Sequence, residues 1–329
     1  MVAGRPAVGD TGRVEDGRLM LLDTAALYFR AFFGVPDTVR APDGTPVNAV
    51  RGLLDMIARL VTDFAPTGLI ACWDDDWRPE WRVQLIPSYK THRVAEVVEV
   101  GPDIEIVPDP LVSQVPIIVE TLTALGIPIL GKAGYEADDI IGTLAATAAG
   151  PVDVVTGDRD LFQVIDDSRQ VRVIYTARGM SKLEIVTDAV LRGKYGVAAA
   201  QYADFAVMRG DSSDGLPGVA GIGEKTAASL LAQFGDLDGI IAAAGDARVP
   251  LSAGIRMKIA AAADYLTRAP TVVEVVRDLD LPAAPARIGI PDPGRDELDR
   301  LQTRWGLGSS VSRVVAALDT DHSGTGRSR

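Results

Sequence analysis

The sequence predicts an α/β protein with a mostly parallel central sheet flanked by helices. From residue 18 to about residue 198, short apolar runs alternate with amphipathic helical patterns, as in parallel sheets whose strands are joined by helices. From Ala199 onward the pattern is helical with Gly-rich turns. We therefore place a boundary near residue 198 and expect a helical part after it.

The strands are predicted from apolar runs that are too short for helices. The run Leu19 to Asp23 is typical of a buried strand that ends on an acid, and Leu69 to Trp73 leads directly into Asp74, Asp75 and Asp76. The other expected strands lie at residues 127–130, 152–156 and 171–175.

The helices are predicted from apolar stripes and from their end signals. Residues 49–64 carry apolar side chains on one stripe, and Asn48 is the expected cap. A second helix is expected to end near Leu125, before Gly126, with Pro116 marking its start or a kink. Further helices are expected at residues 140–149, 188–195 and 227–234.

These elements divide the chain into regions. Residues 1–17 and 319–329 lack periodicity and are predicted to be disordered tails. Residues 18–198 form the predicted α/β core, and residues 199–318 form the predicted helical part. Within the core, residues 77–110 are irregular and Pro-containing, which indicates an insertion.

The composition excludes several classes of protein. No apolar run approaches the roughly 20 residues that span a bilayer, and the first residues lack the apolar segment of a secretory signal. The single cysteine, Cys72, excludes an internal disulfide and a cysteine-based zinc cluster, and the only histidines are His92 and His322. We therefore expect a cytoplasmic protein with no membrane partner, in which any catalytic metal is held by oxygen ligands.

The net charge argues, at first, against binding to polyanions. The chain has 33 Lys and Arg against 45 Asp and Glu, a formal net charge of −12. Phosphate neutralisation requires Lys and Arg, so a general nucleic-acid binder would be expected to carry the opposite sign. The distribution of the charges, however, decides what the surface can bind.

The acids concentrate where the predicted strands end. Asp23 and Asp74 follow two strands, and Asp158 and Asp160 follow the strand at residues 152–156. In open α/β sheets the ligand crevice lies outside the carboxyl ends of the strands, so these acids should converge. Glu136, Asp138 and Asp139 begin a helix at the same edge, and Asp211 and Asp214 could face one way if their turn is helical.

So many carboxylates cannot all remain ionised without compensation, because neighbouring negative charges raise one another's pKa values and burial raises them further. No Lys/Arg cluster accompanies them in the sequence, although Arg159 lies within the set. Mg²⁺ and Mn²⁺ prefer such oxygen ligands, and two ions about 4 Å apart stabilise phosphoryl transfer. Each acid alone is more simply a turn residue or a helix cap; the conjunction favours a metal site.

A Gly-rich turn at Gly218 to Thr226 opens the helix expected at 227–234. Backbone N–H groups at a helix start can bind phosphate, and Lys225 adds a positive charge. The alternative interpretation is an ordinary helix–helix turn. The spacing differs from that of a Walker P-loop, so nucleotide hydrolysis is rejected.

The insertion at residues 77–110 interleaves basic and aromatic residues, a pattern suited to single-stranded nucleic acid. The alternative is a solvated, Pro-rich surface loop. The residues concerned are Trp77, Arg78, Trp81, Arg82, Tyr89, Lys90 and Arg93.

Three acidic motifs carry a resemblance to the 5′-nuclease family. They are Tyr135-Glu-Ala-Asp-Asp-Ile140, Thr156-Gly-Asp-Arg-Asp160 and Gly210-Asp-Ser-Ser-Asp-Gly-Leu-Pro-Gly218. This family includes flap endonucleases and the 5′–3′ exonuclease domain of bacterial DNA polymerase I. The similarity extends from about Arg18 to about Asp319, and no polymerase follows, so the chain looks like a stand-alone bacterial form.

The resemblance implies a metal-dependent 5′–3′ exonuclease and 5′-flap endonuclease that acts in replication and repair. Its cofactors would be two divalent cations, Mg²⁺ or Mn²⁺. The first ion would be served by Asp23, Asp74, Glu136 and Asp138, and the second by Asp139, Asp158, Asp160, Asp211 and Asp214. The spacing to Trp81-Arg82 fits Asp75 as well, but the end of the strand favours Asp74.

The resemblance also assigns the DNA contacts. Residues 77–110 would form the helical arch through which a 5′ flap threads, with Lys90 and Arg93 at the scissile phosphate. The turn at Gly218 to Thr226 would be a helix-hairpin-helix, or helix–three-turn–helix, unit that grips duplex DNA and commonly binds K⁺ through main-chain oxygens. The expected DNA-binding residues are Arg82, Tyr89, Gly218, Gly221, Gly223, Lys225 and Thr226.

We therefore expect a nucleoid-associated monomer whose partner is DNA with a 5′ flap or 5′ end and a duplex segment. If nine acids serve metals, the remaining formal charge is 33 − (45 − 9) = −3. Two other functions stay open from the residues: a catalytically silent DNA-structure binder and a ribonuclease of the related PIN-like architecture. An Asp-x-Asp phosphatase is disfavoured because it would leave the other acids unexplained.

Overall fold

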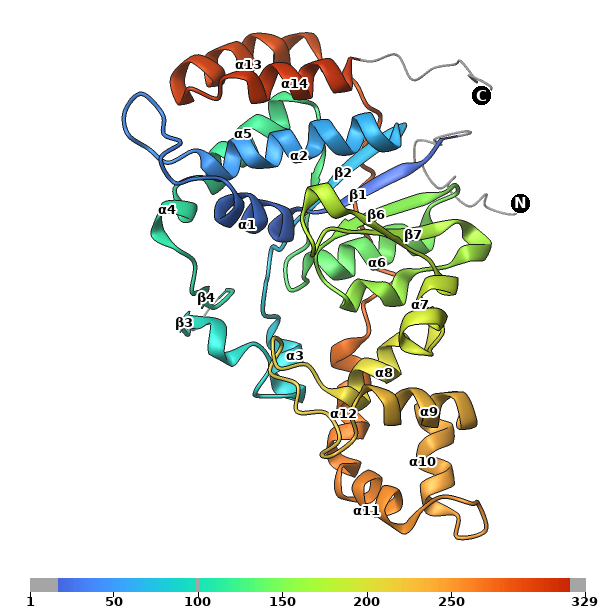
Figure 1. Ribbon diagram of the computed structural model, residues 1–329. Helices are drawn as coiled ribbons and strands as arrows, with labels where there is room; N and C mark the ends of the chain where they lie inside the picture. The colour runs from blue at the N-terminus through green and yellow to red at the C-terminus, as the bar shows by residue number, and fades with distance from the viewer. Residues whose placement is uncertain (1–16, 99–100, 320–329) are drawn as a thin grey trace, which may run out of the picture.

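A computed structural model describes residues 17–98 and 101–319 of the chain (Figure 1). The two predicted tails and His322 therefore lie outside the described residues, apart from Gly17 and Asp319. The molecule is elongated, with a sheet-containing core at one end and a helical extension at the other.

The core is built on a six-stranded sheet with the order β5-β2-β1-β6-β7-β8. All pairs are parallel except β7 with β8. The predicted strands are all present, although the third is shortened, and β8 is additional. Their bounds are β1 Leu19–Asp23, β2 Gly68–Cys72, β5 Ile129–Leu130, β6 Val152–Thr156, β7 Val171–Tyr175 and β8 Glu184–Val186.

Side chains alternate between the two faces of the sheet, as the pleat requires. On β1, Met20 and Leu22 pack in one hydrophobic cluster, with α2, and Leu21 packs in another, with α6. The helices of the core are α1 Thr24–Gly34, α2 Asn48–Phe64, α5 Val115–Ala124, α6 Ala137–Thr147 and α7 Asp188–Tyr195. Short 3₁₀ helices lie at Asp160–Val164, Asp167–Arg169 and Met180–Lys182.

Asn48 does not cap α2 as expected. It is the first helical residue, and its side-chain amide donates hydrogen bonds to the carbonyls of Phe32 (2.8 Å) and Val35 (3.1 Å). The side chain therefore ties the end of α1 to the start of α2.

The insertion is helical only in part. Helix α3 is followed by a 3₁₀ turn and by two short antiparallel strands, and then by α4. The bounds are α3 Glu80–Leu85, 3₁₀ Thr91–Arg93, β3 Val94–Glu96, β4 Ile104–Glu105 and α4 Asp109–Val112.

The helical extension contains five α-helices, which begin after a 3₁₀ turn at Ala199–Gln201. They are α8 Tyr202–Arg209, α9 Glu224–Phe234, α10 Leu237–Gly245, α11 Ala253–Ala261 and α12 Ala263–Val273. The expected helix 227–234 is thus longer at its start.

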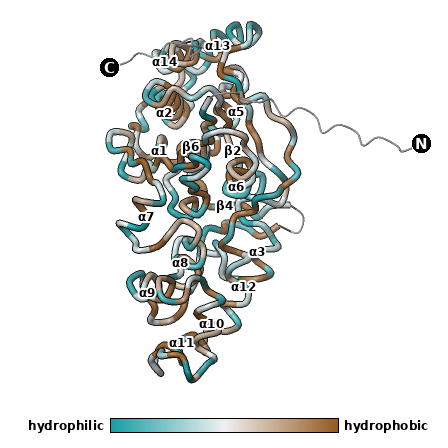
Figure 2. Tube along the Cα trace, turned by 90° about the vertical axis from the view of Figure 1, so that its right-hand side faces the viewer, coloured by the Kyte–Doolittle hydropathy of each residue, from teal (hydrophilic) through white to brown (hydrophobic). Residues whose placement is uncertain are grey.

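The last two helices correct the predicted division at 199–318. Helices α13 Asp292–Trp305 and α14 Ser309–Leu318 return to the far end of the core, beside α2 and α5 (Figure 1). Val311 and Val314 share a hydrophobic cluster with Leu53 and Leu54 of α2, and Figure 2 shows hydrophobic colour along α2 and α14. The chain therefore leaves the core after residue 198 and re-enters it.

Within the described residues, no single helix is long and apolar enough to cross a membrane. Helices α9 and α10 would be long and apolar enough only if they were taken together, and they are bent by 83° relative to each other.

Candidate active site

The predicted acids gather at the point where the strand order reverses. Strand β1 lies between β2 and β6, and the chain builds outward from it in both directions. Asp23 is the last residue of β1, and Asp158 follows β6. The carboxyl ends of strands on the two sides of such a point form the ligand crevice of an open sheet.

A cleft of about 1010 Å³ opens at this point. Five of the acids predicted to bind metal are among its lining residues: Asp23, Asp74, Glu136, Asp138 and Asp158. Lys90 and Arg93 line the same cleft, so the two residues expected at the scissile phosphate lie beside the acids. The structure therefore brings together segments that are separated by more than a hundred residues in the sequence.

Asp23 is held rigidly at the end of β1. One carboxylate oxygen accepts the N–H of Ala26 at 3.2 Å and thereby caps α1, and the other accepts the hydroxyl of Thr156 at 2.6 Å. Burial raises the pKa of Asp23 from 3.8 to about 6, against the effect of these hydrogen bonds, and Asp158 raises it further. Thr156 also accepts the N–H of Asp158 at 2.9 Å, so one hydroxyl aligns two acids.

Asp74, rather than Asp75, faces the cleft. Asp74 accepts the N–H of Ala137 at 2.8 Å, whereas Asp75 is exposed and lies against Gly131. Burial, with the charges of Asp23 and Glu136, raises the pKa of Asp74 to about 7. The position at the strand end was therefore the better guide to which acid lies in the site.

Asp138 also has a pKa well above its ordinary value. Burial is the main cause, followed by the charges of Asp23 and Asp158. A raised pKa shows that the local environment disfavours the ionised form, so these acids form a site that a cation would stabilise.

A second group of acids lies nearby. Asp160, Asp214, Glu136 and Asp138 line a small cavity of about 20 Å³. Burial raises the pKa of Asp214 to about 6, and burial with the charge of Asp158 raises that of Asp160 well above its ordinary value. One oxygen of Asp160 is buried without a hydrogen-bond partner in the described part of the chain.

Asp211 lies in a turn that is not helical. The spacing would let Asp211 and Asp214 face one way only if this turn were helical, so that condition is not met. Its backbone pairs with Leu216, and its carboxylate accepts hydrogen bonds from the Ser213 N–H at 2.8 Å and from Arg209 at 3.1 Å. It lines neither the cleft nor the small cavity.

The acids are accompanied by cations that the linear sequence does not place beside them. Glu136 accepts the Arg82 guanidinium at 3.0 Å and the Tyr89 hydroxyl at 2.6 Å, and its other oxygen is paired with the ammonium of Lys90. These partners outweigh burial and lower the pKa of Glu136. In the described residues as they stand, no three acidic, thiol or imidazole side chains converge closely enough to hold a metal ion.

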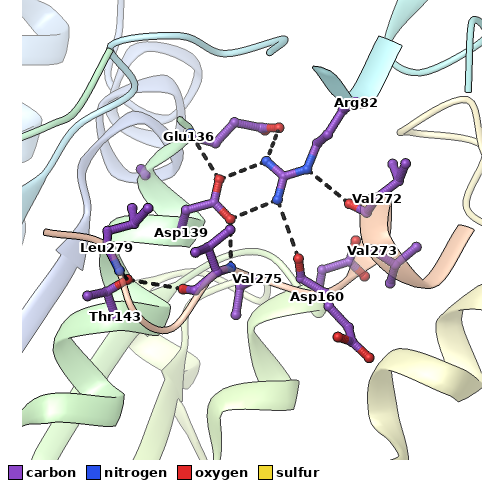
Figure 3. Close-up of polar contacts among 12 residues, drawn as sticks. Arg82, Glu136, Asp139, Thr143, Asp160, Val272, Val273, Val275 and Leu279 are labelled. Carbon is purple, nitrogen blue, oxygen red and sulfur yellow. Dashed lines mark hydrogen bonds and ion pairs between the residues drawn. The ribbon is translucent and has the colours of Figure 1, made fainter. Parts of the chain in front are cut away.

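Arg82 and Asp139 differ from their expected roles. Asp139 is fully buried, and both of its oxygens face Arg82, at 2.8 and 2.7 Å (Figure 3). Arg82 is only 3% exposed, so it lies inside the structure and not on a surface that DNA could contact. Asp139 lines neither the cleft nor the small cavity.

The basic and aromatic residues of the insertion are mostly engaged with one another. The Trp77 indole donates to the Asp103 carbonyl at 2.6 Å, and the Arg78 guanidinium donates to the Tyr89 carbonyl at 2.7 Å. Tyr89 is buried, so it does not offer the stacking surface expected of it. Arg93 is half-buried, pairs with Glu105 and lies over the Trp77 ring.

The Gly-rich turn precedes α9 as expected. Gly221, Gly223 and Lys225 are exposed, while Gly218 and Thr226 are half-buried. Gly218 has a φ of 65°, and a Cβ there would meet the backbone of Gly210, so only glycine fits. The ammonium of Lys258, on α11, donates to the Gly221 carbonyl at 2.8 Å and thereby ties the turn to α11.

Two features of the site were missed from the sequence. Thr156 ends a strand and carries no charge, so its role as a shared hydrogen-bonding group gave no signal. Tyr28 and Phe29 form an aromatic wall of the cleft on α1. Their signal was present in the aromatic residues at positions 28, 29, 32 and 33, in the segment after Asp23.

Two family models match the chain in succession. The model described as "5′-3′ exonuclease, N-terminal resolvase-like domain" matches residues 18–196, and "5′-3′ exonuclease, C-terminal SAM fold" matches residues 197–296. The chain is 60% identical over 301 residues to a 5′-3′ exonuclease of Streptomyces coelicolor, covering 91% of this chain and 99% of the relative. It is 50% identical to a 5′-3′ exonuclease of Mycobacterium tuberculosis, covering 92% and 98%.

Similarity to solved structures supports the fold. The T5 5′-exonuclease with bound zinc matches with a TM-score of 0.60 at 18% identity, covering 92% of this chain and all (100%) of that one. The catalytic core of Rad2 in complex with DNA substrate matches with a TM-score of 0.56 at 17% identity, covering 95% of each chain.

Proposed function

Since the chain belongs to the 5′–3′ exonuclease family and is a nuclease, we propose that it hydrolyses DNA phosphodiesters with two divalent cations, at 5′ ends and at 5′ flaps. The observation that carries this proposal is the set of buried and half-buried carboxylates with raised pKa values around one cleft at the switch point of the sheet. A silent DNA-binding protein would have no use for such a cluster, because unpaired buried carboxylates are costly.

The side chains present suit Mg²⁺ or Mn²⁺, which prefer carboxylate oxygens. Asp23, Asp74, Glu136 and Asp138 would hold the first ion. Asp158, Asp160, Asp211 and Asp214 would hold the second, with Asp211 acting through water because it lies outside the small cavity. When bound, the ions would activate water and neutralise the leaving oxygen.

Lys90 and Arg93 would contact the scissile phosphate from the insertion side of the cleft. Both line the cleft with the acids, and both are cations held near a position where negative charge develops. The cations of the cleft would thus attract the strand that its acids repel.

The duplex would lie on the turn at Gly218 to Thr226. Gly223, Glu224 and Lys225 are exposed at the start of α9, and a helix N-terminus with the Lys225 ammonium suits phosphate without reading bases, so binding would be independent of sequence. A K⁺ ion, if bound, would be held by main-chain oxygens of this turn other than that of Gly221, which already accepts from the Lys258 ammonium.

The test uses a labelled 5′-flap DNA with Mn²⁺ and the double variant Asp158→Ala, Asp160→Ala. We expect cleavage to be abolished while duplex binding persists, because the turn at Gly218 to Thr226 is untouched. Metal-dependent cleavage that survives in the double variant would overturn the assignment. A matched RNA substrate serves as the control, since preferential cleavage of RNA would favour a ribonuclease.

A further inference from the structure

Arg82 and Asp139 form an ion pair that is sealed from solvent. Asp139 is 0% and Arg82 3% exposed. One oxygen of Asp139 accepts from the Arg82 guanidinium and from the Val276 N–H at 2.9 Å, and the other accepts from Arg82 and from the Glu136 N–H at 3.3 Å. Neither oxygen of Asp139 is therefore left to bind an ion.

The pair joins three segments that are far apart in the sequence (Figure 3). Arg82 lies on α3 of the insertion, Asp139 lies in the first turn of α6, and Arg82 Nε donates to the carbonyl of Val272 at the end of α12 at 3.0 Å. The Val276 contact of Asp139 fixes the chain just after α12. The insertion, the core and the helical extension thus meet at one buried ion pair.

The same pair determines how Glu136 is held. Arg82 donates to Oε1 of Glu136, while Asp139 accepts the Glu136 N–H in a capping box that starts α6. The opposite oxygen, Oε2, is the one paired with Lys90, and both Glu136 and Lys90 line the cleft. Arg82 therefore engages Oε1, while Oε2 faces Lys90, a residue that lines the cleft.

We propose that Arg82 and Asp139 are positioning residues, and that Asp139 is not a metal ligand. Asp139 neutralises and orients Arg82, and Arg82 holds Glu136 at the angle from which it can bind a cation. The planar guanidinium suits this role because it engages both carboxylates in fixed directions, which an ammonium cannot do. This inference rests on the proposed metal function of Glu136.

The decisive measurement is direct titration of the metal-free full-length protein with Mn²⁺ alone, comparing Asp139→Asn with Asp138→Asn. The two positions are adjacent, and the substitutions are identical, but only Asp138 lines the cleft. We expect Asp139→Asn to keep the number of bound ions of the unchanged protein, with affinity weaker by about 10- to 100-fold, as is typical for residues that orient metal ligands. Asp138→Asn is expected to lose an ion.

A loss of one ion in Asp139→Asn would overturn the inference, because it would make Asp139 a ligand. If Asp138→Asn also binds Mn²⁺ unchanged, the proposed metal site itself is wrong, which is a separate failure. The same titration therefore distinguishes the two.

Arg82→Lys provides a second variant that keeps the buried charge. We expect the same ion count and weaker Mn²⁺ affinity, and cleavage of flap DNA that is restored in large part by saturating Mn²⁺. A general loss of folding would lower cleavage at every Mn²⁺ concentration alike. Arg82→Lys with the Mn²⁺ affinity of the unchanged protein would contradict a positioning role.

Discussion

Lys90 is placed by its backbone as much as by its charge. Its φ of 49° lies in the left-handed region, which residues other than glycine rarely adopt, and its N–H donates to the Asp214 carbonyl at 2.9 Å. The ammonium is consequently buried against Glu136. In the metal-free site, Lys90 provides the positive charge that Glu136 requires.

Lys90→Ala should separate catalysis from metal binding. We expect cleavage to fall by about 10²-fold, the size typical of losing one group that stabilises transition-state charge. Mn²⁺ affinity should be equal or higher, because a cation that competes for Glu136 has been removed. Parallel Mn²⁺ titration and single-turnover cleavage test this, and a large loss of Mn²⁺ affinity would speak against it.

The acids of the cleft should make the stability of the metal-free protein depend on pH. Burial raises the pKa of Asp74 from 3.8 to about 7 and that of Asp23 from 3.8 to about 6. Between the ordinary pKa of 3.8 and these raised values, the folded state binds more protons than the unfolded state. The contribution of these groups to the free energy of unfolding should therefore fall as the pH rises from about 4 to about 7.

Divalent ions should reverse this trend, because they bind the deprotonated acids. We expect the increase in Tm caused by Mn²⁺ to be larger at about pH 7.5 than at about pH 5. Asp74→Asn should show a smaller pH dependence when measured in chelator. An Mn²⁺-induced shift in Tm that does not vary with pH would be inconsistent with the raised pKa values.

At the scale of elements, the turn before α9 is the part of the extension most suited to phosphate. Gly221 and Gly223 are exposed. Glu224 lies 3.5 Å from Arg159 and from Arg209, which ties the start of α9 to the acid-bearing segments. A strand bound at this turn, as we propose, would lie next to two ion pairs that connect α9 to these segments.

Lys225→Ala should weaken duplex binding without regard to sequence. Removing one phosphate contact is expected to reduce the slope of log K against log salt by about one unit. Binding measured at several salt concentrations tests this, with Arg300→Ala on the distant α13 as the control. Equal effects of the two variants would show that the contact is not local to the turn.

Elements with periodic patterns could be predicted from the sequence, and contacts between distant segments could not. The strands before Asp23, Asp74 and Asp158 follow from their apolar runs, and their convergence follows from sheet geometry. Arg82 was assigned to DNA because its neighbours in the sequence are basic and aromatic. Its burial depends on Asp139 and on the chain after α12, which no local pattern reveals.

At the scale of the whole molecule, the described residues begin with β1 and end with α14, both in the core, and the extension lies between them in the sequence. Helix α14 packs on α2, and Arg313 forms a bidentate ion pair with Asp55, at 2.7 and 2.9 Å. This return could not be predicted from the sequence, because α13 and α14 are amphipathic helices like those of the extension. The core therefore needs residues that follow the helical extension.

Leu307→Ala should consequently destabilise the core although it lies beyond the extension. Leu307 is 0% exposed between α13 and α14 and belongs to the cluster that contains Leu53 and Leu54. Large-to-small changes at such positions cost about 2–5 kcal/mol of the free energy of unfolding. Met257→Ala, at a side chain that is 68% exposed on α11, is the control and should change stability little.

Urea unfolding followed by tryptophan fluorescence measures both, because Trp73 and Trp305 border the cluster. If Leu307→Ala shifted the transition no more than Met257→Ala does, the C-terminal helices would not be part of the core.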